Sequence, residues 1–329
     1  MPPPGANAVP YRGMDPVLAP VLAIVGPTAT GKSALAMALA ERLGGEIVNA
    51  DALQVYRGFD IGTAKPGPEE RARVPHHLID ILDPDERYSA GEFARRARQA
   101  IAEIQGRGRV PLVVGGSGLY LRALCDGLSP VPPGDPEVRR TLRERLEAGG
   151  LAPLREELSR LDPATAQRLG AGDTQRVLRA LEVALVSGRA LSAWTAEQPF
   201  GTQGIAAIRV GLTLPRGILY DQIAGRVTQM LEAGWLEEVE TLLRQEFSPT
   251  LPAFQAIGYR QLVRYLEGTV SLELAVADIV RETRRFAKRQ ETWFRKEPEV
   301  AWFSAQDLER QIPGVLEHAK HRGLGRAYG

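Results

Sequence analysis

The hydrophobic and polar positions of this chain fall into short apolar runs separated by longer amphipathic segments. Apolar runs at residues 21–25 and 110–114 predict buried strands, and strand patterns at 46–49 and 206–214 predict two more. Residues 90–105 lie between two of these runs, carry apolar side chains at helical spacing and predict a helix. Strands that alternate with helices indicate βαβ units, so we expect an α/β fold built on a parallel sheet flanked by helices.

The segment 125–200 has a different pattern, because it begins with several prolines and contains no convincing strand. Helical spacing recurs along the whole segment, which predicts an all-helical insertion domain. The predicted helices of this domain are 137–148, 151–161, 163–169 and 174–187. A strand pattern returns after the segment, so the core domain is expected to be discontinuous in sequence.

Proline, glycine and alanine dominate residues 1–16, which predicts a disordered tail. We assign residues 17–124 and 201–312 to the core domain and expect a C-terminal tail at 313–329. The second half of the core adds predicted helices at 217–233, 236–245 and 272–296, and a strand at 300–303.

The composition is that of a globular protein: of 329 residues, 44% are hydrophobic and 25% are charged. No apolar run approaches the roughly 20 residues of a membrane helix, so we expect no membrane contact. A single cysteine, Cys125, excludes an internal disulfide and a cysteine-built zinc site, and we therefore expect a cytoplasmic protein. The net charge is +1, so affinity for nucleic acid would require local clustering of the 41 basic residues.

Residues 26–33 read Gly-Pro-Thr-Ala-Thr-Gly-Lys-Ser and fit the phosphate-binding P-loop pattern, between a predicted strand and a predicted helix. Such a loop points backbone N–H groups at an anion, and the helix N-terminus adds partial positive charge. Lys32 brings a full charge to the outer phosphate, and the Ser33 hydroxyl can ligate Mg²⁺. The pattern specifies a polyphosphate, but not which one. The predicted diphosphate-binding residues are Gly26, Thr28, Ala29, Thr30, Gly31, Lys32 and Ser33.

Two polar residues follow other predicted strands: Asp51 follows 46–49, and Ser117 follows 110–114. Ligands bind at the carboxyl edge of a parallel sheet, so both residues are expected in the same crevice as Lys32. A carboxylate beside bound phosphates can be a magnesium ligand or a general base. For Asp51 and Ser117 alike, the alternative role is that of a helix N-cap.

The predicted helix 272–296 carries a basic stripe, which suits the phosphate backbone of a nucleic acid. A solvated charged face is the alternative. The apolar residues Ile279, Phe286 and Trp293 repeat every seven positions and are expected to pack on the core. The basic residues are Arg281, Arg284, Arg285, Lys288, Arg289, Arg295 and Lys296.

Some distinctive side chains are interpreted as structural. His76 and His77 have no accompanying cysteine or histidine cluster, so we expect a structural loop and not a metal site. Cys125 is expected to be a small buried residue. The tryptophans Trp235, Trp293 and Trp302 are expected in the core.

Several further segments of the chain are distinctive: DALQVY at 51–56, DIGTAKP at 60–66, PHHL at 75–78, GGSGLY at 115–120, DPEVR at 135–139, QRVLRALE at 175–182, IGYRQ at 257–261 and AKRQETW at 287–293. Each segment alone is weakly to moderately specific, and together with the P-loop they are highly specific. In order and in residues they resemble the tRNA dimethylallyltransferase (tRNA isopentenyltransferase) family, and the resemblance covers roughly residues 20–305.

The resemblance implies transfer of a dimethylallyl group from dimethylallyl diphosphate to N6 of the adenosine adjacent 3′ to the anticodon in tRNA. By match, Asp51 is the general base, Ser117 lies near the reacting centre and Arg226 adds a positive contact to the diphosphate. The implied partners are the tRNA anticodon stem-loop and dimethylallyl diphosphate, with Mg²⁺ as cofactor, and we expect a monomer. The tRNA contacts predicted by match are Asp51, Ala52, Leu53, Gln54, Ser117, Arg139, Gln175, Arg176, Val177, Leu178, Arg179, Gln255, Gly258, Tyr259 and Arg260, and the basic helix adds Arg284, Arg285, Lys288 and Arg289.

The chain departs from the family pattern at a few positions. Ala52 stands where serine is frequent, and Ser33 replaces a frequent threonine but keeps the hydroxyl. Gln222 occupies a position often held by arginine, which lowers the expected positive charge near the diphosphate.

The main alternative function is a P-loop kinase of a small molecule or nucleotide that binds ATP. It accounts for Lys32, Ser33 and Asp51, but not for the basic helix or the insertion. A non-catalytic tRNA-binding protein that uses the P-loop as a nucleotide sensor is a further alternative.

Overall fold

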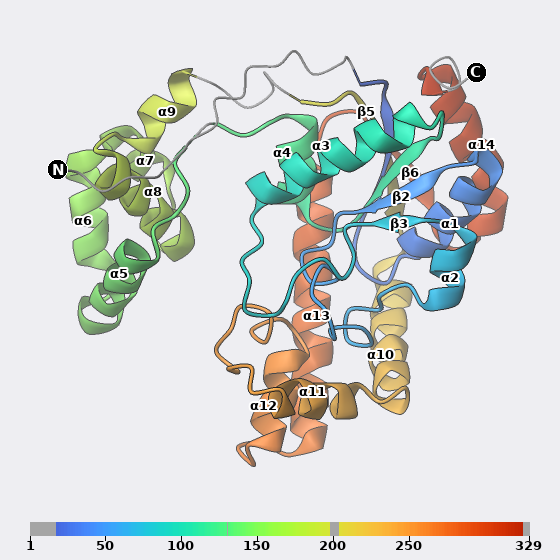
Figure 1. Cartoon of the computed structure of the whole chain (residues 1–329). Coiled ribbons are helices and arrows are strands. Elements are labelled where there is room, and N and C mark those ends of the chain that lie inside the picture. The colour runs from blue at the N-terminus through green and yellow to red at the C-terminus, as the bar shows by residue number, and fades with distance from the viewer. Residues whose placement is uncertain (1–17, 130, 198–203, 325–329) are drawn as a thin grey trace. The chain divides into compact units, whose positions relative to one another are not determined.

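The computed structural model describes residues 18–129, 131–197 and 204–324, and its centre is a six-stranded sheet with the strand order β3-β2-β4-β1-β5-β6 (Figure 1). Every strand pair is parallel, which confirms the predicted α/β fold. The strand β3 was not predicted, because a two-residue edge strand leaves no periodic signal. The strands are β1 (Val21–Val25), β2 (Glu46–Asn49), β3 (His76–His77), β4 (Pro111–Val114), β5 (Ala207–Thr213) and β6 (Val300–Ser304).

Helices cover both faces of the sheet, which is why its central strands read as continuous apolar runs (Figure 1). On one face, α1 (Lys32–Leu43) and α14 (Leu308–His321) pack against Leu22, Leu112 and Val210. On the other face lies α3 (Ala90–Gly106), which buries a stripe of apolar residues at helical spacing. The Ser89 hydroxyl caps α3 by accepting a hydrogen bond from the Glu92 N–H.

The prediction of a C-terminal tail at 313–329 is wrong for the first part of this segment. Residues 308–321 form α14, in which Ile312, Val315 and Ala319 are buried against the core cluster of the sheet. Their spacing of three and four residues was the available signal. A proline inside this helix, Pro313, interrupts the pattern on which the sequence prediction relied. The other expected tail, 1–16, lies outside the described residues.

A second group of helices follows β5 and packs on the loops that leave β2. Phe59, from such a loop, lies with its ring centroid 4.6 Å from that of Tyr259 and 5.2 Å from that of Phe254. The helices of this group are α10 (Arg216–Glu232), α11 (Trp235–Arg244), α12 (Tyr259–Leu266) and α13 (Leu272–Phe294), and the short α2 (Pro68–Arg73) precedes β3.

The chain divides into two compact units, Met1–Leu121 with Ile205–Gly329, and Arg122–Gly204. We call the first the core unit and the second the helical unit. The helical unit has its own apolar centre, which includes Leu142, Leu158 and Val177. Among the described residues, none of the helices is both long and apolar enough to cross a membrane. The remaining helices are α4 (Gly118–Cys125), which reaches from the core unit into the helical unit, and α5 (Pro136–Gly149), α6 (Leu151–Leu161), α7 (Pro163–Arg168), α8 (Thr174–Ser187) and α9 (Leu191–Glu197).

Candidate active site

The turn at residues 26–33 links β1 to α1 and has an open anion-binding geometry. Gly31 precedes α1 with a φ of 80°, a left-handed conformation that favours glycine, and no side chain caps the helix start. The first N–H groups of α1 are therefore available to an anion. Pro27 O accepts hydrogen bonds from the Thr30 hydroxyl (2.8 Å) and from the Lys32 ammonium (2.6 Å). The phosphate-binding turn is thus held in shape by its own side chains.

The cavity beside this turn brings together residues that are far apart in sequence. Lys32 and Ser33 line it from the start of α1, Asp51 from the end of β2, and Arg226 from the middle of α10. The prediction that Asp51 faces the same crevice as Lys32 is therefore confirmed. Parallel strands ending at one edge of the sheet explain this convergence.

Asp51 is half-buried at the cavity wall, and one of its oxygens is used to hold its own loop. Its Oδ1 accepts hydrogen bonds from the Leu53 N–H (2.8 Å) and, more weakly, from the Gln54 N–H (3.4 Å). This is the backbone-capping geometry that the sequence left as an alternative. No other hydrogen bond to the Asp51 carboxylate is found in the described part of the chain, so Oδ2 can accept a proton from a substrate.

Two cations face Asp51 in an environment that disfavours charge. The pKa of Lys32 is lowered to about 7, first because the ammonium is buried and then because Arg226 is positively charged, while Asp51 acts in the opposite direction. Burial likewise lowers the pKa of Arg226, and Asp51 opposes this shift. Among the described residues Arg226 makes neither a hydrogen bond nor an ion pair. Two half-buried cations with so little compensation favour a polyanionic ligand.

The glycine-rich turn after β4 forms another part of the cavity wall. Gly115 and Gly116 line the cavity, whereas Ser117 is half-buried at the start of α4 and is not among the lining residues. Among the described residues the Ser117 hydroxyl makes no hydrogen bond, so the alternative N-cap contact is absent. Ser117 is adjacent to the cavity, without a capping role.

Helix α13 contributes two lining residues, Phe286 and Gln290, which lie one turn apart on the same face. The expectation that Phe286 packs in the core is wrong, because 37% of the residue is exposed. Ile279, by contrast, is buried as predicted. Gln290 was not among the predicted site residues, because a glutamine within a charged helix has no distinctive pattern.

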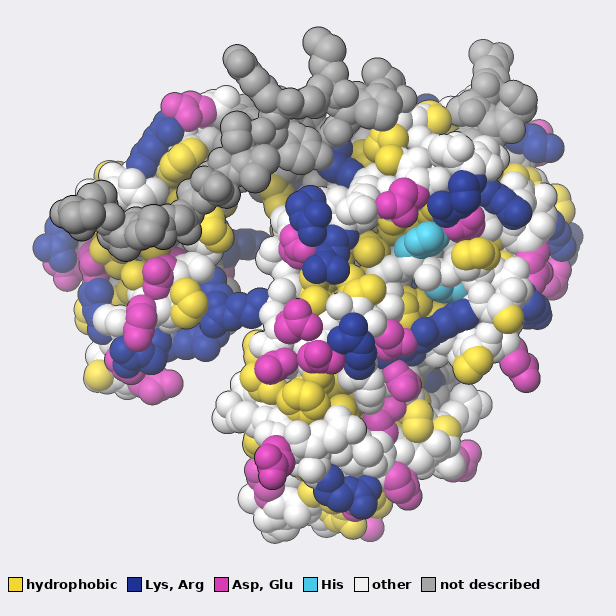
Figure 2. Space-filling model, in the orientation of Figure 1, with side chains coloured by type: hydrophobic (Ala, Val, Ile, Leu, Met, Phe, Trp, Pro, Cys, Tyr) yellow, Lys and Arg dark blue, Asp and Glu magenta, His cyan; other side chains and the backbone are white. Residues whose placement is uncertain are grey.

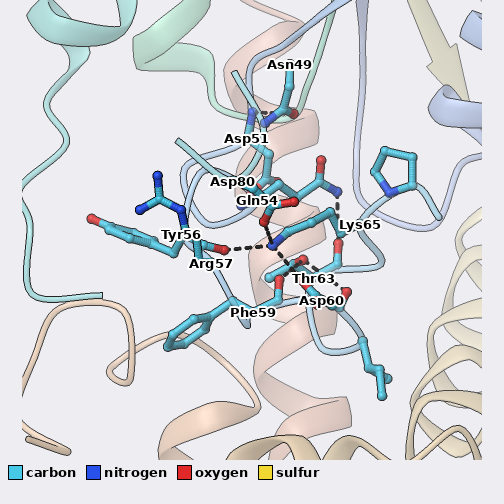
Figure 3. A network of polar contacts seen from close by, with 12 residues as sticks. Asn49, Asp51, Gln54, Tyr56, Arg57, Phe59, Asp60, Thr63, Lys65 and Asp80 are labelled. Atoms are coloured by element: carbon cyan, nitrogen blue, oxygen red, sulfur yellow. Dashed lines mark hydrogen bonds and ion pairs between the residues drawn. The ribbon is translucent and has the colours of Figure 1, made fainter. Parts of the chain in front are cut away.

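A buried ion network fixes the loop between β2 and α2 (Figure 3). The Lys65 side chain is 1% exposed, and its ammonium donates to Asp80 Oδ1 (2.6 Å), Asp60 Oδ1 (2.5 Å) and Tyr56 O (2.7 Å). The Gln54 amide donates to Thr63 O (3.0 Å) from the same loop. Since Gln54 and Thr63 line the cavity, the Lys65 network shapes the wall beside Asp51.

The predicted tRNA contacts of the core unit have different degrees of exposure. Ala52 and Gln255 are exposed, and Leu53 and Arg260 are partly so. Gly258 and Tyr259 are buried, and the Tyr259 hydroxyl donates to Glu238 Oε1 at 2.6 Å. The predicted tRNA contact of Tyr259 is therefore wrong for its side chain, which instead joins α12 to α11.

The basic stripe of α13 is partly neutralised by acids on the same helix. Arg285 pairs with Glu282 at 2.6 Å, and Arg281 pairs with Asp278. Arg284 is half-buried, with its guanidinium carbon 5.1 Å from the ring centroid of Tyr220. Lys288 and Arg289 on α13 and Lys296 just after it are exposed and have no ion pair within the described residues, so these three carry exposed, uncompensated charge.

The helical unit contains a second group of predicted contacts, organised around a buried acid. The Glu182 side chain is 3% exposed and pairs with Arg139 at 2.8 Å and with Arg179 at 2.8 Å. Gln175 and Arg176 are exposed at the start of α8, and Leu178 is half-buried. Val177 is wholly buried, so a contact by its side chain is not available. In the view of Figure 2, both acidic and basic side chains are visible on each unit.

The residues interpreted as structural have mixed outcomes. His77 bonds through Nε2 to Glu46 Oε2 at 2.7 Å, which is a structural role in β3, while His76 lines the cavity. Trp235 is buried as expected, but Trp302 is 37% exposed and Cys125 is only partly buried. In the described residues no cluster of His, Cys, Asp and Glu could hold a metal by itself.

Fold and site together define a P-loop-like α/β protein in which the cavity beside the glycine-rich turn contains two cations and a carboxylate. The family model described as IPP transferase matches residues 54–297, and the one described as isopentenyl transferase matches residues 19–80. The chain belongs to the IPP transferase family.

Similar proteins agree with this assignment. The chain is 50% identical to a tRNA dimethylallyltransferase of Syntrophobacter fumaroxidans over 297 residues, which cover 90% of this chain and 87% of that protein. It is also 50% identical to one of Halorhodospira halophila over 306 residues, or 92% and 98% of the two chains.

Solved structures extend the likeness to the fold. The tRNA isopentenylpyrophosphate transferase of Bacillus halodurans has a TM-score of 0.68 at 39% identity, covering 94% of this chain and 97% of that one. A eukaryotic dimethylallyltransferase described as acting on tRNA has a TM-score of 0.77 at 29% identity, covering 91% and 77%.

Proposed function

We propose that this protein transfers the dimethylallyl group of dimethylallyl diphosphate to N6 of the adenosine adjacent 3′ to the anticodon in tRNA. The observation that carries the proposal is the shared cavity of Lys32, Arg226 and Asp51. Two cations there can receive a diphosphate leaving group, and one carboxylate can receive a proton. Membership of the IPP transferase family supports the choice of group transferred.

The reaction needs one bond to form and one to break at the allylic carbon. The exocyclic nitrogen of the adenine attacks C1 of the donor, and the C–O bond to the diphosphate breaks with its electrons leaving on oxygen. The nitrogen then loses a proton, for which the unoccupied oxygen of Asp51 is the acceptor. Negative charge grows on the leaving oxygen, and Lys32, Arg226 and the N–H groups of α1 stabilise it. Ser117, next to the cavity wall, is proposed to contact the adenosine.

Mg²⁺ is the proposed cofactor, and the residues present fit it. The Ser33 hydroxyl is exposed on the cavity wall beside the phosphate-binding turn, and Mg²⁺ takes oxygen ligands mainly from phosphates, water and few protein groups. Ser33 would hold the ion together with the diphosphate. When bound, the ion supplies positive charge to the leaving group.

The tRNA anticodon stem-loop is the proposed partner, and two described surfaces support it. One consists of Lys288 and Arg289 on α13, whose charges are uncompensated within the described residues. The other lies on the helical unit, where Arg176 is exposed and Arg139 and Arg179 are half-buried. The adenosine must leave its stack to reach the cavity. All catalytic groups come from one core unit, so a monomer suffices, and we expect a cytoplasmic activity because the substrate is tRNA.

The test is incubation of the protein with unmodified tRNA, labelled dimethylallyl diphosphate and Mg²⁺, followed by mass analysis of the nucleosides. We expect one prenylated adenosine per tRNA, and Asp51→Asn to slow transfer by at least about 10²-fold while donor binding persists. A parallel titration with ATP tests the kinase alternative. ATP binding and hydrolysis with no prenyl transfer would replace the proposal by that alternative.

A further inference from the structure

Helix α13 is hydrogen-bonded to the phosphate-binding turn through the side chain of Gln290. Gln290 is 7% exposed and lines the cavity. Its Oε1 accepts a hydrogen bond from the Thr28 N–H at 2.8 Å, and its Nε2 donates to Gly116 O at 3.0 Å. Thr28 belongs to the phosphate-binding turn, and Gly116 to the glycine-rich turn after β4. One carboxamide therefore joins two walls of the cavity.

The chemistry of this bridge requires a carboxamide. The group must accept from an N–H on one side and donate to a carbonyl on the other, and an amide does both at once. The opposite orientation would set donor against donor and acceptor against acceptor, so these contacts fix the orientation of the side chain. A carboxylate could keep the bond from Thr28 but could not donate to Gly116 O.

The glycine at position 116 is explained by the same contact. A Cβ added there would lie 2.1 Å from Gln290 Nε2, far inside van der Waals contact. The backbone of the glycine-rich turn can approach the amide only because residue 116 has no side chain. The next atoms around that Cβ lie at 3.2 Å or more, so Gln290 is the group that alanine would displace.

Resting on the function proposed above, we propose that Gln290 is a positioning residue for the transfer reaction. Its carboxamide sets the spacing between the phosphate-binding turn, which holds the diphosphate, and the glycine-rich turn, beside which the acceptor base enters. It also occupies the Thr28 N–H, so the diphosphate is held by the later amides of the turn and by Lys32. Without this bridge the dimethylallyl diphosphate is held less precisely, while the contacts to tRNA remain.

The test compares Gln290→Leu, which keeps the approximate size but neither hydrogen bond, with Thr292→Val as the matched control. Thr292 lies on the same helix, and within the described residues its hydroxyl bonds only to Lys288 O, at 2.9 Å. For Gln290→Leu we expect kcat/KM for the donor to fall about tenfold to a hundredfold, since small displacements in a reacting pair have effects of this order. In Gln290→Leu the KM for tRNA should stay at the wild-type value. In the control, Thr292→Val, the thermal midpoint should stay at the wild-type value.

A double-mutant cycle tests the contact itself. Gly116→Ala should reduce donor kcat/KM on its own, because the new methyl displaces the amide of Gln290. In a Gln290→Ala background the same alanine should have little further effect, since the group it displaces is gone. Independent, additive effects of the two substitutions would overturn the proposed bridge.

Other outcomes are also decisive. If Gln290→Leu lowers the thermal midpoint but leaves kcat and KM unchanged, Gln290 has only a packing role. If Gln290→Leu raises the KM for tRNA and the KM for the donor equally, Gln290 does not specifically position the donor. If Gln290→Leu does not fold, Gln290→Glu is measured instead, and unchanged donor kinetics there would overturn the proposal. Calorimetric titration with dimethylallyl diphosphate reads out donor binding even if wild-type protein transfers nothing, which separates failure of this inference from failure of the proposed function.

Discussion

The buried ammonium of Lys65 lies 2.6 Å from Oδ1 of Asp80, and the other oxygen of Asp80 accepts from Arg71 at 2.7 Å. Burial alone would raise the pKa of Asp80, but the hydrogen bonds from Lys65 and Arg71 outweigh it and lower the pKa. This ion pair ties the loop that carries Gln54 and Thr63 to the segment after β3. The shape of the cavity wall beside Asp51 depends on it.

Replacing Lys65 should therefore destabilise the fold. Lys65→Met leaves Asp80 without its buried partner, and we expect a loss of about 2 kcal/mol, less than for a fully buried pair because Asp80 keeps contact with water. Urea unfolding at pH 7 measures the change. Arg57→Met is the control, because Arg57 pairs with Asp83 at a similar 2.7 Å but on the surface. Equal effects of the two substitutions would show that burial of Lys65 is unimportant.

Donor binding should consume a proton near neutral pH. The pKa of Lys32 is about 7 without ligand, so above pH 7 the amine is mostly neutral, while a bound diphosphate stabilises its charged form. Affinity for dimethylallyl diphosphate should consequently fall as the pH rises above about 7, a range in which the terminal phosphate is already ionised. Calorimetric titration at pH 8 in two buffers of different ionisation enthalpy measures the proton uptake.

A matched variant separates charge from titration at this position. Lys32→Arg keeps a positive charge that does not titrate near neutral pH, so its donor binding should show no proton uptake. Proton uptake of the same size in Lys32→Arg would assign the titration to another group. Lys32→Ala should reduce the transfer rate by at least about 10²-fold, because the leaving group loses a stabilising charge.

The arginines and lysines of α13 that have no ion pair should determine how strongly tRNA binding depends on salt. Replacing Lys288 and Arg289 together by alanine should reduce the slope of log K against log salt by about 1 for each phosphate that the variant no longer neutralises. Arg281→Ala is the control, because Arg281 already pairs with Asp278. Filter-binding titrations across a salt series measure the slopes. A control slope that falls as steeply would mean that the ion pairs of α13 open when tRNA binds.

The buried carboxylate of the helical unit should matter for tRNA and not for the donor. Glu182→Gln removes the charge that holds Arg139 and Arg179, and we expect the KM for tRNA to rise by on the order of tenfold. The KM for dimethylallyl diphosphate should not change. Glu144→Gln is the control, since Glu144 pairs with Arg140 on the exposed side of α5. A changed donor KM in Glu182→Gln would contradict the separate roles of the two units.

The sequence alone determined five of the six strands, the glycine-rich turn at residues 26–33 and the convergence of Asp51 with Lys32. These features depend on local patterns: continuous apolar runs, a glycine-lysine-serine turn, and the rule that parallel strands end at one edge. The short segments that resemble the family are likewise local. All of them could be read before any contact between distant residues was known.

Only the tertiary structure decided which side chains complete the site and which charges are free. Gln290 bonds to Thr28 across a separation of 262 positions, and Phe286 faces the cavity although its spacing is that of a core residue. Glu282 neutralises part of the basic stripe, while Val177 and Tyr259 are buried within segments that read as contact surface. Periodicity assigns a residue to a face of its helix, but the elements packed against that face determine its burial and partners, and these are brought together only by folding.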